Sequence, residues 1–137
     1  MRRVLALIAL LAVAGIPALA ADNPYAVAGI SDPAHVTQFL ARLKQAVASG
    51  DRAAVASMVD FPLTVHEVKG ASKTYRDAAA LRANYARVFT PEVVDAVAAA
   101  KPDDLFARDQ GVMIGQGEIW MNEVQGTMKV ITVNHTR

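Results

Sequence analysis

Residues 105–134 read LFARDQGVMIGQGEIWMNEVQGTMKVITVN, and this stretch decides the fold. Its apolar, strand-like runs are separated by turn-forming residues at 109–111 and at 122–126. Short apolar runs bounded by Asn, Asp and Gly are typical of antiparallel strands joined by hairpins. We therefore predict a meander of three strands, around which the upstream part of the chain is arranged.

The middle strand of this meander contains a change of phase. Val112 and Ile114 are apolar at even positions, whereas Ile119 and Met121 are apolar at odd positions. A β-bulge shifts the alternation by one residue, and glycine tolerates the backbone angles that a bulge requires. The glycines within residues 115–117 therefore predict a bulge that bends the sheet and makes a concave face for helices.

Helices are predicted upstream of the meander. Asp32 followed by Pro33 is a typical helix start, and apolar residues then recur at helical spacing until Gly50. Asp51 begins a second, shorter helix, so that the two helices form a hairpin. Residues 61–68 alternate as a strand.

Two more helices separate this strand from the meander. A brief return strand at residues 73–76 precedes a third helix, which Asp77 caps and which extends to residue 89. Thr90 and Pro91 open a fourth helix that ends before Pro102. We therefore predict an α+β domain at residues 32–137, in which a helical hairpin and a helix pair pack on a strongly curved, mostly antiparallel sheet, a cone-like roll. Residues 21–31 are expected to form a flexible leader.

Residues 1–20 are typical of a secretory signal peptide, with two arginines, an apolar run, a helix-breaking Gly15 and Pro17, and a small-x-small ending. The apolar run is shorter than the ~20 residues that a membrane-spanning helix needs. We therefore expect a secreted protein located in the periplasm, with no membrane association after cleavage.

The composition of the remaining chain excludes several classes of partner and site. Removing residues 1–20 leaves 117 residues with 12 Lys and Arg against 13 Asp and Glu, a net charge of −1. No cluster of cations is present, so we expect no nucleic-acid partner. Cysteine is absent, which excludes disulfides and thiolate metal sites. His35, His66 and His135 lack ligand spacing, so neither a metal nor a cofactor is expected.

Glu67 is the candidate catalytic residue. It alternates with Phe61, Leu63 and Val65, so an inward-facing strand would place its carboxylate at the mouth of an apolar interior. Desolvation there would raise the pKa of Glu67 and make it a general base. The alternative is that Glu67 lies in water at the end of the strand.

Tyr85 and Trp120 are candidates for lining a ligand pocket. Each combines a large apolar ring with one polar group, as pocket residues commonly do. The alternative is that both rings belong to the core.

The order of the predicted elements resembles that of the nuclear transport factor 2-like superfamily, which includes ketosteroid isomerases and polyketide cyclases. The most specific part is residues 39–70, where a helix ending in Ala-Ser-Gly-Asp at 48–51 leads to Thr64-Val65-His66-Glu67. The resemblance implies a cone-shaped α+β fold with an internal pocket. It places Glu67 at the position of the catalytic aspartate of ketosteroid isomerases.

The resemblance also implies two departures from isomerase chemistry. Leu43 stands where those enzymes have a tyrosine that stabilises the oxyanion, and Asn134 corresponds loosely to their second donor. Loss of one such donor typically costs several kcal/mol of transition-state stabilisation.

These observations lead us to expect a domain that binds a small apolar or amphipathic ligand, or a partner, in a cavity lined by Leu43, Val65, Glu67, Tyr85 and Trp120. The alternative is an enzyme of isomerase, dehydratase or cyclase type, with Glu67 as base and with Asn134 and Tyr85 orienting the substrate.

A third hypothesis is a homodimer formed through the sheet. Apolar residues fall on both faces of the last strand, with Met128 and Val130 in one phase and Ile131 and Val133 in the other. Such a strand suits a sheet that meets helices on one face and a second subunit on the other.

Overall fold

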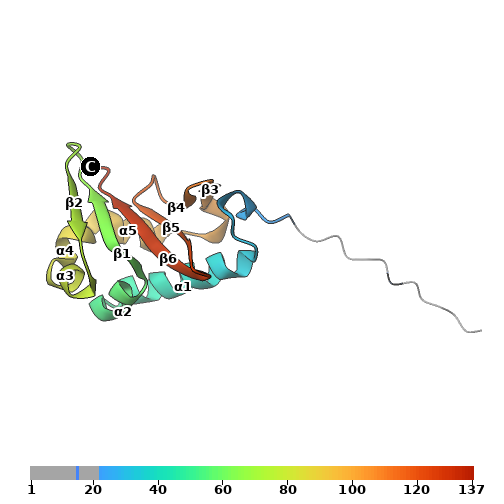
Figure 1. Cartoon of the computed structure of the whole chain (residues 1–137), viewed down its shortest axis with the longest axis horizontal. Helices are drawn as coiled ribbons and strands as arrows, with labels where there is room; N and C mark the ends of the chain where they lie inside the picture. Colours follow the sequence, from blue (N-terminus) through green and yellow to red (C-terminus); the bar gives the residue numbers. More distant parts are fainter. Residues whose placement is uncertain (1–14, 16–21) are drawn as a thin grey trace, which may run out of the picture.

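The computed structural model describes Gly15 and residues 22–137, where five α-helices combine with a six-stranded mixed sheet (Figure 1). The predicted signal peptide lies, except for Gly15, outside the described residues. The helices are α1 (Pro33–Ala48), α2 (Arg52–Ser57), α3 (Ala78–Ala83), α4 (Tyr85–Val88) and α5 (Pro91–Ala99), with the 3-10 turns η1 (Ala26–Ala28) and η2 (Pro102–Asp104). The strands are β1 (Val59–His66), β2 (Ser72–Tyr75), β3 (Phe106–Arg108), β4 (Gly111–Ile114), β5 (Ile119–Val124) and β6 (Thr127–Asn134).

The predicted helix starts are confirmed by their capping hydrogen bonds. The Asp32 carboxylate accepts from the backbone N–H of Ala34 at 2.9 Å, which begins α1. The Asp51 carboxylate accepts from the N–H of Ala54 at 3.0 Å, which begins α2. These bonds satisfy amides of the first helical turn that have no partner within the helix.

The predicted third helix is divided in two. α3 ends at Ala83, and α4 begins at Tyr85 after Asn84, whose φ of −120° departs from helical geometry. The Asn84 side chain donates to the carbonyl of Ala80 at 2.9 Å and so satisfies one of the last carbonyls of α3. An asparagine that bonds to nearby backbone competes with the regular helix.

The strands follow the order β2-β1-β6-β5-β4-β3. The β1–β6 pair is parallel, and the other four pairs are antiparallel. β1 therefore lies inside the sheet, and Pro62 falls in the stretch between Val59 and Thr64 where its register with β6 shifts. This position differs from the edge position that proline usually takes in a sheet.

The prediction of a three-stranded meander with a central bulge was wrong. Residues 105–134 form four strands, and residues 115–118 are the turn between β4 and β5. Ile114 and Ile119 are direct cross-strand partners, so both point to one face although their positions differ by an odd number, five. A reversal of the chain therefore produces the same change of phase as a bulge would.

An irregularity does occur in β6. Trp120 pairs with Thr132 and Met121 pairs with Val130, so Ile131 is an extra residue between them. The two apolar phases of β6 follow from this insertion, because the residues on its two sides keep opposite alternations.

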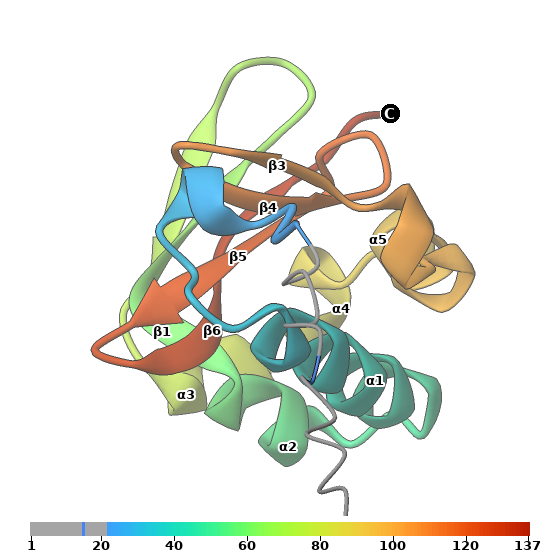
Figure 2. The ribbon, with the colours of Figure 1, turned by 90° about the vertical axis from the view of Figure 1, so that its right-hand side faces the viewer.

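The helices cover one face of the sheet (Figure 2). Strand residues that point toward them are buried, namely Leu63, Val65, Val112, Ile114, Ile119, Met121, Val130 and Val133. Successive strand residues point to opposite faces. The uncovered face therefore carries a row of direct cross-strand partners through all six strands, in the order Phe106, Met113, Trp120, Thr132, Thr64 and Thr74. We call it the outer row.

Residues 22–31 are packed against the domain, which differs from the flexible leader that we predicted. Tyr25 and Ile30 are buried in the core. The Asn23 amide donates to the carbonyls of Ile30 at 2.7 Å and Ser31 at 3.1 Å, which closes this segment into a turn. Burial of two large apolar side chains favours the ordered state of the segment.

Candidate functional site

The residues that we predicted to line one cavity lie in three different places. Leu43 and Val65 are fully packed in the core, together with Tyr85. Glu67 is exposed after the end of β1, and Trp120 is partly exposed on the outer row. Trp120 cannot share a helix-side cavity, because its neighbours Ile119 and Met121 occupy that side.

Tyr85 is held by aromatic and cationic contacts. Its ring stacks on that of Phe89 with centroids 4.9 Å apart, and the Arg52 guanidinium lies 5.4 Å from its centroid. The Tyr85 hydroxyl is buried and has no hydrogen-bond partner among the described residues. Burial raises the pKa of Tyr85, and the charge of Arg52 lowers it in part. The structure therefore places Tyr85 as a core residue.

Glu67 is exposed to water beyond the end of β1, which is the alternative to the inward-facing position considered from the sequence. It lines an open hollow of about 420 Å³ with Thr90, Pro91 and His135 among others. Its backbone N–H donates to the carbonyl of Ala71 at 2.7 Å, which holds the turn after β1. An exposed carboxylate lacks the desolvation on which we based its role as a base.

Asn134 connects the end of β6 to the turn between β4 and β5. Its side-chain amide donates to the carbonyl of Gly117 at 2.7 Å, and its backbone N–H donates to the carbonyl of Glu118 at 2.9 Å. The backbone N–H and one of the two side-chain N–H groups are therefore engaged within the protein, while the second side-chain N–H and Oδ1 remain available.

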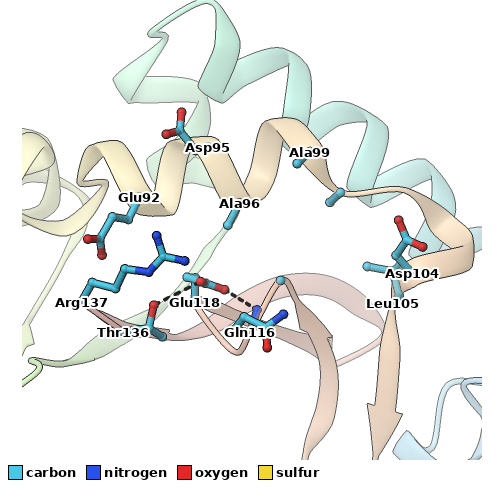
Figure 3. A pocket seen from close by; sticks show the side chains of 12 residues that line it. Glu92, Asp95, Ala96, Ala99, Asp104, Leu105, Gln116, Glu118, Thr136 and Arg137 are labelled. Atoms are coloured by element: carbon cyan, nitrogen blue, oxygen red, sulfur yellow. Dashed lines mark hydrogen bonds between the residues drawn. The ribbon is translucent and has the colours of Figure 1, made fainter.

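A pocket lies between α5 and residues 115–118, the turn between β4 and β5. It has a volume of about 470 Å³. Figure 3 shows α5 above it and the turn below it. Its apolar lining consists of Ala96, Ala99, Ala100 and Leu105, and its carboxylates are Glu92, Asp95, Asp104 and Glu118. We call this pocket the acidic cleft.

Helical spacing explains how α5 lines the acidic cleft. Val93 and Val97 turn into the core, so positions 92, 95, 96 and 99 share the opposite side of the helix. α5 is fixed at its end by Lys44 of α1, whose ammonium donates to the carbonyl of Ala100. Glu92 and Asp95 therefore both lie on the part of α5 that borders the acidic cleft.

Glu118 is the buried carboxylate of the acidic cleft, with only 7% of its surface exposed. Its Oε2 accepts from the N–H of Gln116 at 2.6 Å, and its Oε1 accepts from the Thr136 hydroxyl at 3.2 Å. Figure 3 shows both bonds. A Cβ atom on Gly115 would collide with Oε2 and would lie 3.2 Å from the Cβ of Ala96. Glycine at position 115 therefore makes room for this carboxylate beside α5.

The acidic cleft carries a net negative lining. Four carboxylates and one guanidinium, that of Arg137, line it, and within the described part of the chain none of the carboxylates forms an ion pair. In Figure 3, Arg137 lies at the end near Glu92, and Asp104 and Leu105 lie at the other end. The end near Asp104 therefore combines negative charge with apolar surface.

Our sequence reasoning did not identify the acidic cleft. The available signal was the spacing of Glu92 and Asp95 on one side of a helix, together with an acid in the sequence GQGEI. We interpreted residues 115–117 as a bend within one strand, and Glu118 was therefore not considered as a turn residue facing a helix. Only the pairing of β4 with β5 brings it to α5.

Within residues 22–137 and Gly15, no group of three or more His, Asp or Glu side chains could hold a metal ion. No helix in this part of the chain is long and apolar enough to cross a membrane. A comparison with known protein families, with characterised proteins and with solved structures found no match.

Proposed function

We propose that this chain is a ligand-binding domain whose acidic cleft takes a small amphipathic molecule with a cationic group. The observation that carries the proposal is the combination of a pocket of about 470 Å³, an apolar lining and four carboxylates without ion-pair partners among the described residues. Ligand sites are typically concave and mostly apolar, with a few polar groups that set specificity.

Electrostatics favour a cation over an anion or a neutral molecule. A unit charge 4 Å from a carboxylate gains about 1 kcal/mol in water and about 4 kcal/mol at the effective dielectric of a protein surface. Asp104 and Leu105 supply a charge and an apolar contact at the same end of the cleft. An ammonium attached to a small apolar group satisfies both.

We further propose that the domain is secreted and belongs to the nuclear transport factor 2-like superfamily, with a cone-like roll. The first part rests on residues 1–20, and the second on the element order and the residues that carry the resemblance. Catalysis by Glu67 is not part of the proposal, because its exposed position provides no desolvation.

Three probes of similar size separate the effect of charge from that of shape, namely benzylamine, benzyl alcohol and benzoate. We expect benzylamine, and not benzoate, to shift the backbone NMR signals of Ala96, Gln116 and Thr136. Benzyl alcohol should bind at least about tenfold more weakly than benzylamine, which corresponds to about 1.4 kcal/mol. Equal binding of the three probes, or shifts located elsewhere, would overturn the proposal.

A pair of variants locates the charge that matters. Asp104→Asn removes a carboxylate of the cleft and should weaken benzylamine several-fold. Asp109→Asn is the control, because Asp109 is exposed in the β3–β4 turn beside Arg108 and does not line the cleft. A similar loss in both variants would indicate a nonspecific effect of net charge and would contradict the site.

A further inference from the structure

A second hollow lies on the face of the sheet that the helices leave uncovered. It has a volume of about 320 Å³ and is lined by His66, Gln110, Trp120, Ile131, Thr132 and Asn134. Trp120 and Thr132 are members of the outer row, and the extra residue of β6, Ile131, lies beside them. None of these residues lines the acidic cleft.

The lining of this hollow is uncharged apart from a histidine. It offers one indole ring, two side-chain amides, one hydroxyl and one imidazole. Asp, Glu, Lys and Arg are absent from it. Such a surface has no charge with which to select a phosphate, a carboxylate or an ammonium ion, so it favours a neutral polar ligand.

Hydrogen-bonding groups around Trp120 remain available. The side chains of Gln110 and Thr132 make no hydrogen bond to other residues in the described part of the chain, and Asn134 keeps its Oδ1 as an acceptor. His66 uses Nδ1 in a 2.7 Å contact with the Ser72 hydroxyl, which leaves Nε2 free to bond a ligand. Donors and acceptors therefore surround a partly exposed aromatic ring.

The ring is held on a rigid part of the sheet. Trp120 lies on β5, between β4 and β6, with Met113 and Thr132 as its direct cross-strand partners. A site on paired strands is pre-organised, so that less conformational entropy is lost when a ligand binds.

We propose that this hollow binds a neutral oligosaccharide. A sugar ring presents a face of C–H groups, which suits the flat apolar face of an indole, and hydroxyls at its edge, which suit amides and an imidazole.

A second copy of the chain is the competing occupant of this face. The outer row includes Phe106, which is 54% exposed, and Met113, so self-association would bury apolar surface. A two-fold axis would place the same patch against itself, and a hollow would then face a hollow. Self-association would also bury the side-chain amide of Gln110, which costs free energy unless the second copy supplies a hydrogen-bond partner. These features favour the oligosaccharide.

Trp120 is the single tryptophan of the chain, so its fluorescence reports on this hollow alone. The probes are tri-N-acetylchitotriose and maltotriose, titrated into the full-length mature protein. We expect a saturable shift of the emission for at least one sugar, with a dissociation constant of about 1 mM or lower. Absence of a saturable change with both sugars up to about 20 mM would overturn the proposal.

Variants are compared by calorimetry, because Trp120→Ala removes the fluorophore. Gln110→Ala changes an exposed turn residue and should weaken the sugar several-fold, whereas Trp120→Ala should weaken it at least about tenfold. Phe106→Ala is the matched control, since Phe106 lies on the same face but outside the hollow, and it should bind as the unchanged protein does. Unaltered binding by Gln110→Ala and Trp120→Ala would overturn the assignment of the site.

Self-association gives a distinct result. If the Trp120 emission shifts with protein concentration, sedimentation gives twice the monomer mass, and sugar changes neither, the face is a dimer interface and the oligosaccharide proposal is wrong. This outcome would not affect the proposed function of the acidic cleft, because that pocket is tested with different probes and shares no residue with the hollow.

Discussion

The Thr136 hydroxyl donates a hydrogen bond of 3.2 Å to Oε1 of Glu118, so the segment after β6 is held against the turn between β4 and β5. The other oxygen of the same carboxylate accepts from the N–H of Gln116 at 2.6 Å. One buried side chain therefore joins the turn to the end of the sheet, and it does so at the wall of the acidic cleft. We therefore expect the Glu118 side chain to contribute both to the stability of the fold and to ligand binding in the acidic cleft.

Glu118→Ala should destabilise the protein by about 1.5–3 kcal/mol, because hydrogen bonds to a charged acceptor contribute about that much. Thr136→Val removes only the longer of the two bonds, which an exposed residue donates, and should therefore cost less, about 0.5–1.5 kcal/mol. Urea unfolding at neutral pH measures both. If Glu118→Ala costs no more than Thr136→Val, the bond from Gln116 contributes nothing and this account is incorrect.

Gly115→Ala should be more harmful than Gly126→Ala. Both glycines have positive φ, +66° and +79°, so both substitutions introduce strain of about 1 kcal/mol. The Cβ at position 126 would meet nothing within 4 Å, whereas at position 115 it would collide with the carboxylate of Glu118. The difference in the free energy of unfolding therefore isolates the steric contribution. Equal losses would show that the carboxylate moves aside freely.

Tyr85→Phe should leave the stability unchanged or raise it by up to about 1 kcal/mol, because it removes a buried hydroxyl without a partner among the described residues. The stack on Phe89 and the contact with Arg52 need only the ring. Tyr25→Phe is the control, since the Tyr25 hydroxyl donates to the carbonyl of Pro102 at 3.5 Å and its removal should give a small loss. A clear loss in Tyr85→Phe, measured by thermal unfolding, would reveal a partner for its hydroxyl.

The same substitution should change the response to alkaline pH. Burial raises the pKa of folded Tyr85 above its ordinary value of 10.0, so the folded state retains the proton longer than the unfolded state does. The contribution of protonated Tyr85 to the free energy of unfolding is complete below pH 10.0 and is lost as the pH rises through the folded pKa. Tyr85→Phe should therefore lose less stability than the unchanged protein above that pH. Parallel pH profiles of the two proteins would contradict the burial of this hydroxyl.

His35 should stabilise the fold at acidic pH more than at alkaline pH. The hydrogen bond from its Nδ1 to Glu123 at 2.7 Å raises the pKa of His35, with Asp32 adding to the effect from 3.8 Å and partial desolvation opposing it. A raised pKa means that the contribution is full below the unfolded value of about 6.5 and is lost as the pH rises through the folded pKa.

The measurement compares the melting temperatures of the unchanged protein and His35→Ala from pH 5 to pH 9. The difference should be largest at the acidic end, as long as Glu123 stays ionised, and should shrink toward the alkaline end. Glu123→Gln is the control, because it keeps a hydrogen-bond acceptor but removes the charge, and it should flatten the dependence. A difference that grows with pH would exclude this ion pair.

Local signals predicted several elements correctly. Asp32 with Pro33, Asp51, and Thr90 with Pro91 each begin a helix in the structure, because a cap and a proline act on the adjacent turn alone. The α+β class was also predicted from such local patterns. The division of the third helix at Asn84 was missed, since the competing hydrogen bond of its side chain was not considered.

The residues that line a cavity were harder to predict from the sequence than the helix starts. Leu43, Val65 and Tyr85 were recognised as inward-facing, yet whether inward-facing residues surround a cavity or pack together depends on the volumes of their neighbours. Trp120 was predicted to line the pocket because it combines a large apolar ring with one polar group, and this property does not show on which face of the sheet the ring lies. Alternation identifies which residues share a face of a strand, but not which face meets the helices.

The sequence by itself determined where helices begin, which runs form strands, and that no cysteine can crosslink the fold, because these properties depend on residues within a few positions of one another. Only the tertiary structure decided that β4 and β5 pair across residues 115–118, that β6 joins β1 in parallel, and that Glu118 lies beside α5. The acidic cleft and the hollow at Trp120 both arise from these long-range pairings. The physical reason is that a phase change in an apolar pattern is the same for a bulge and for a reversal, and the choice depends on which strands and helices the reversed chain can pack against.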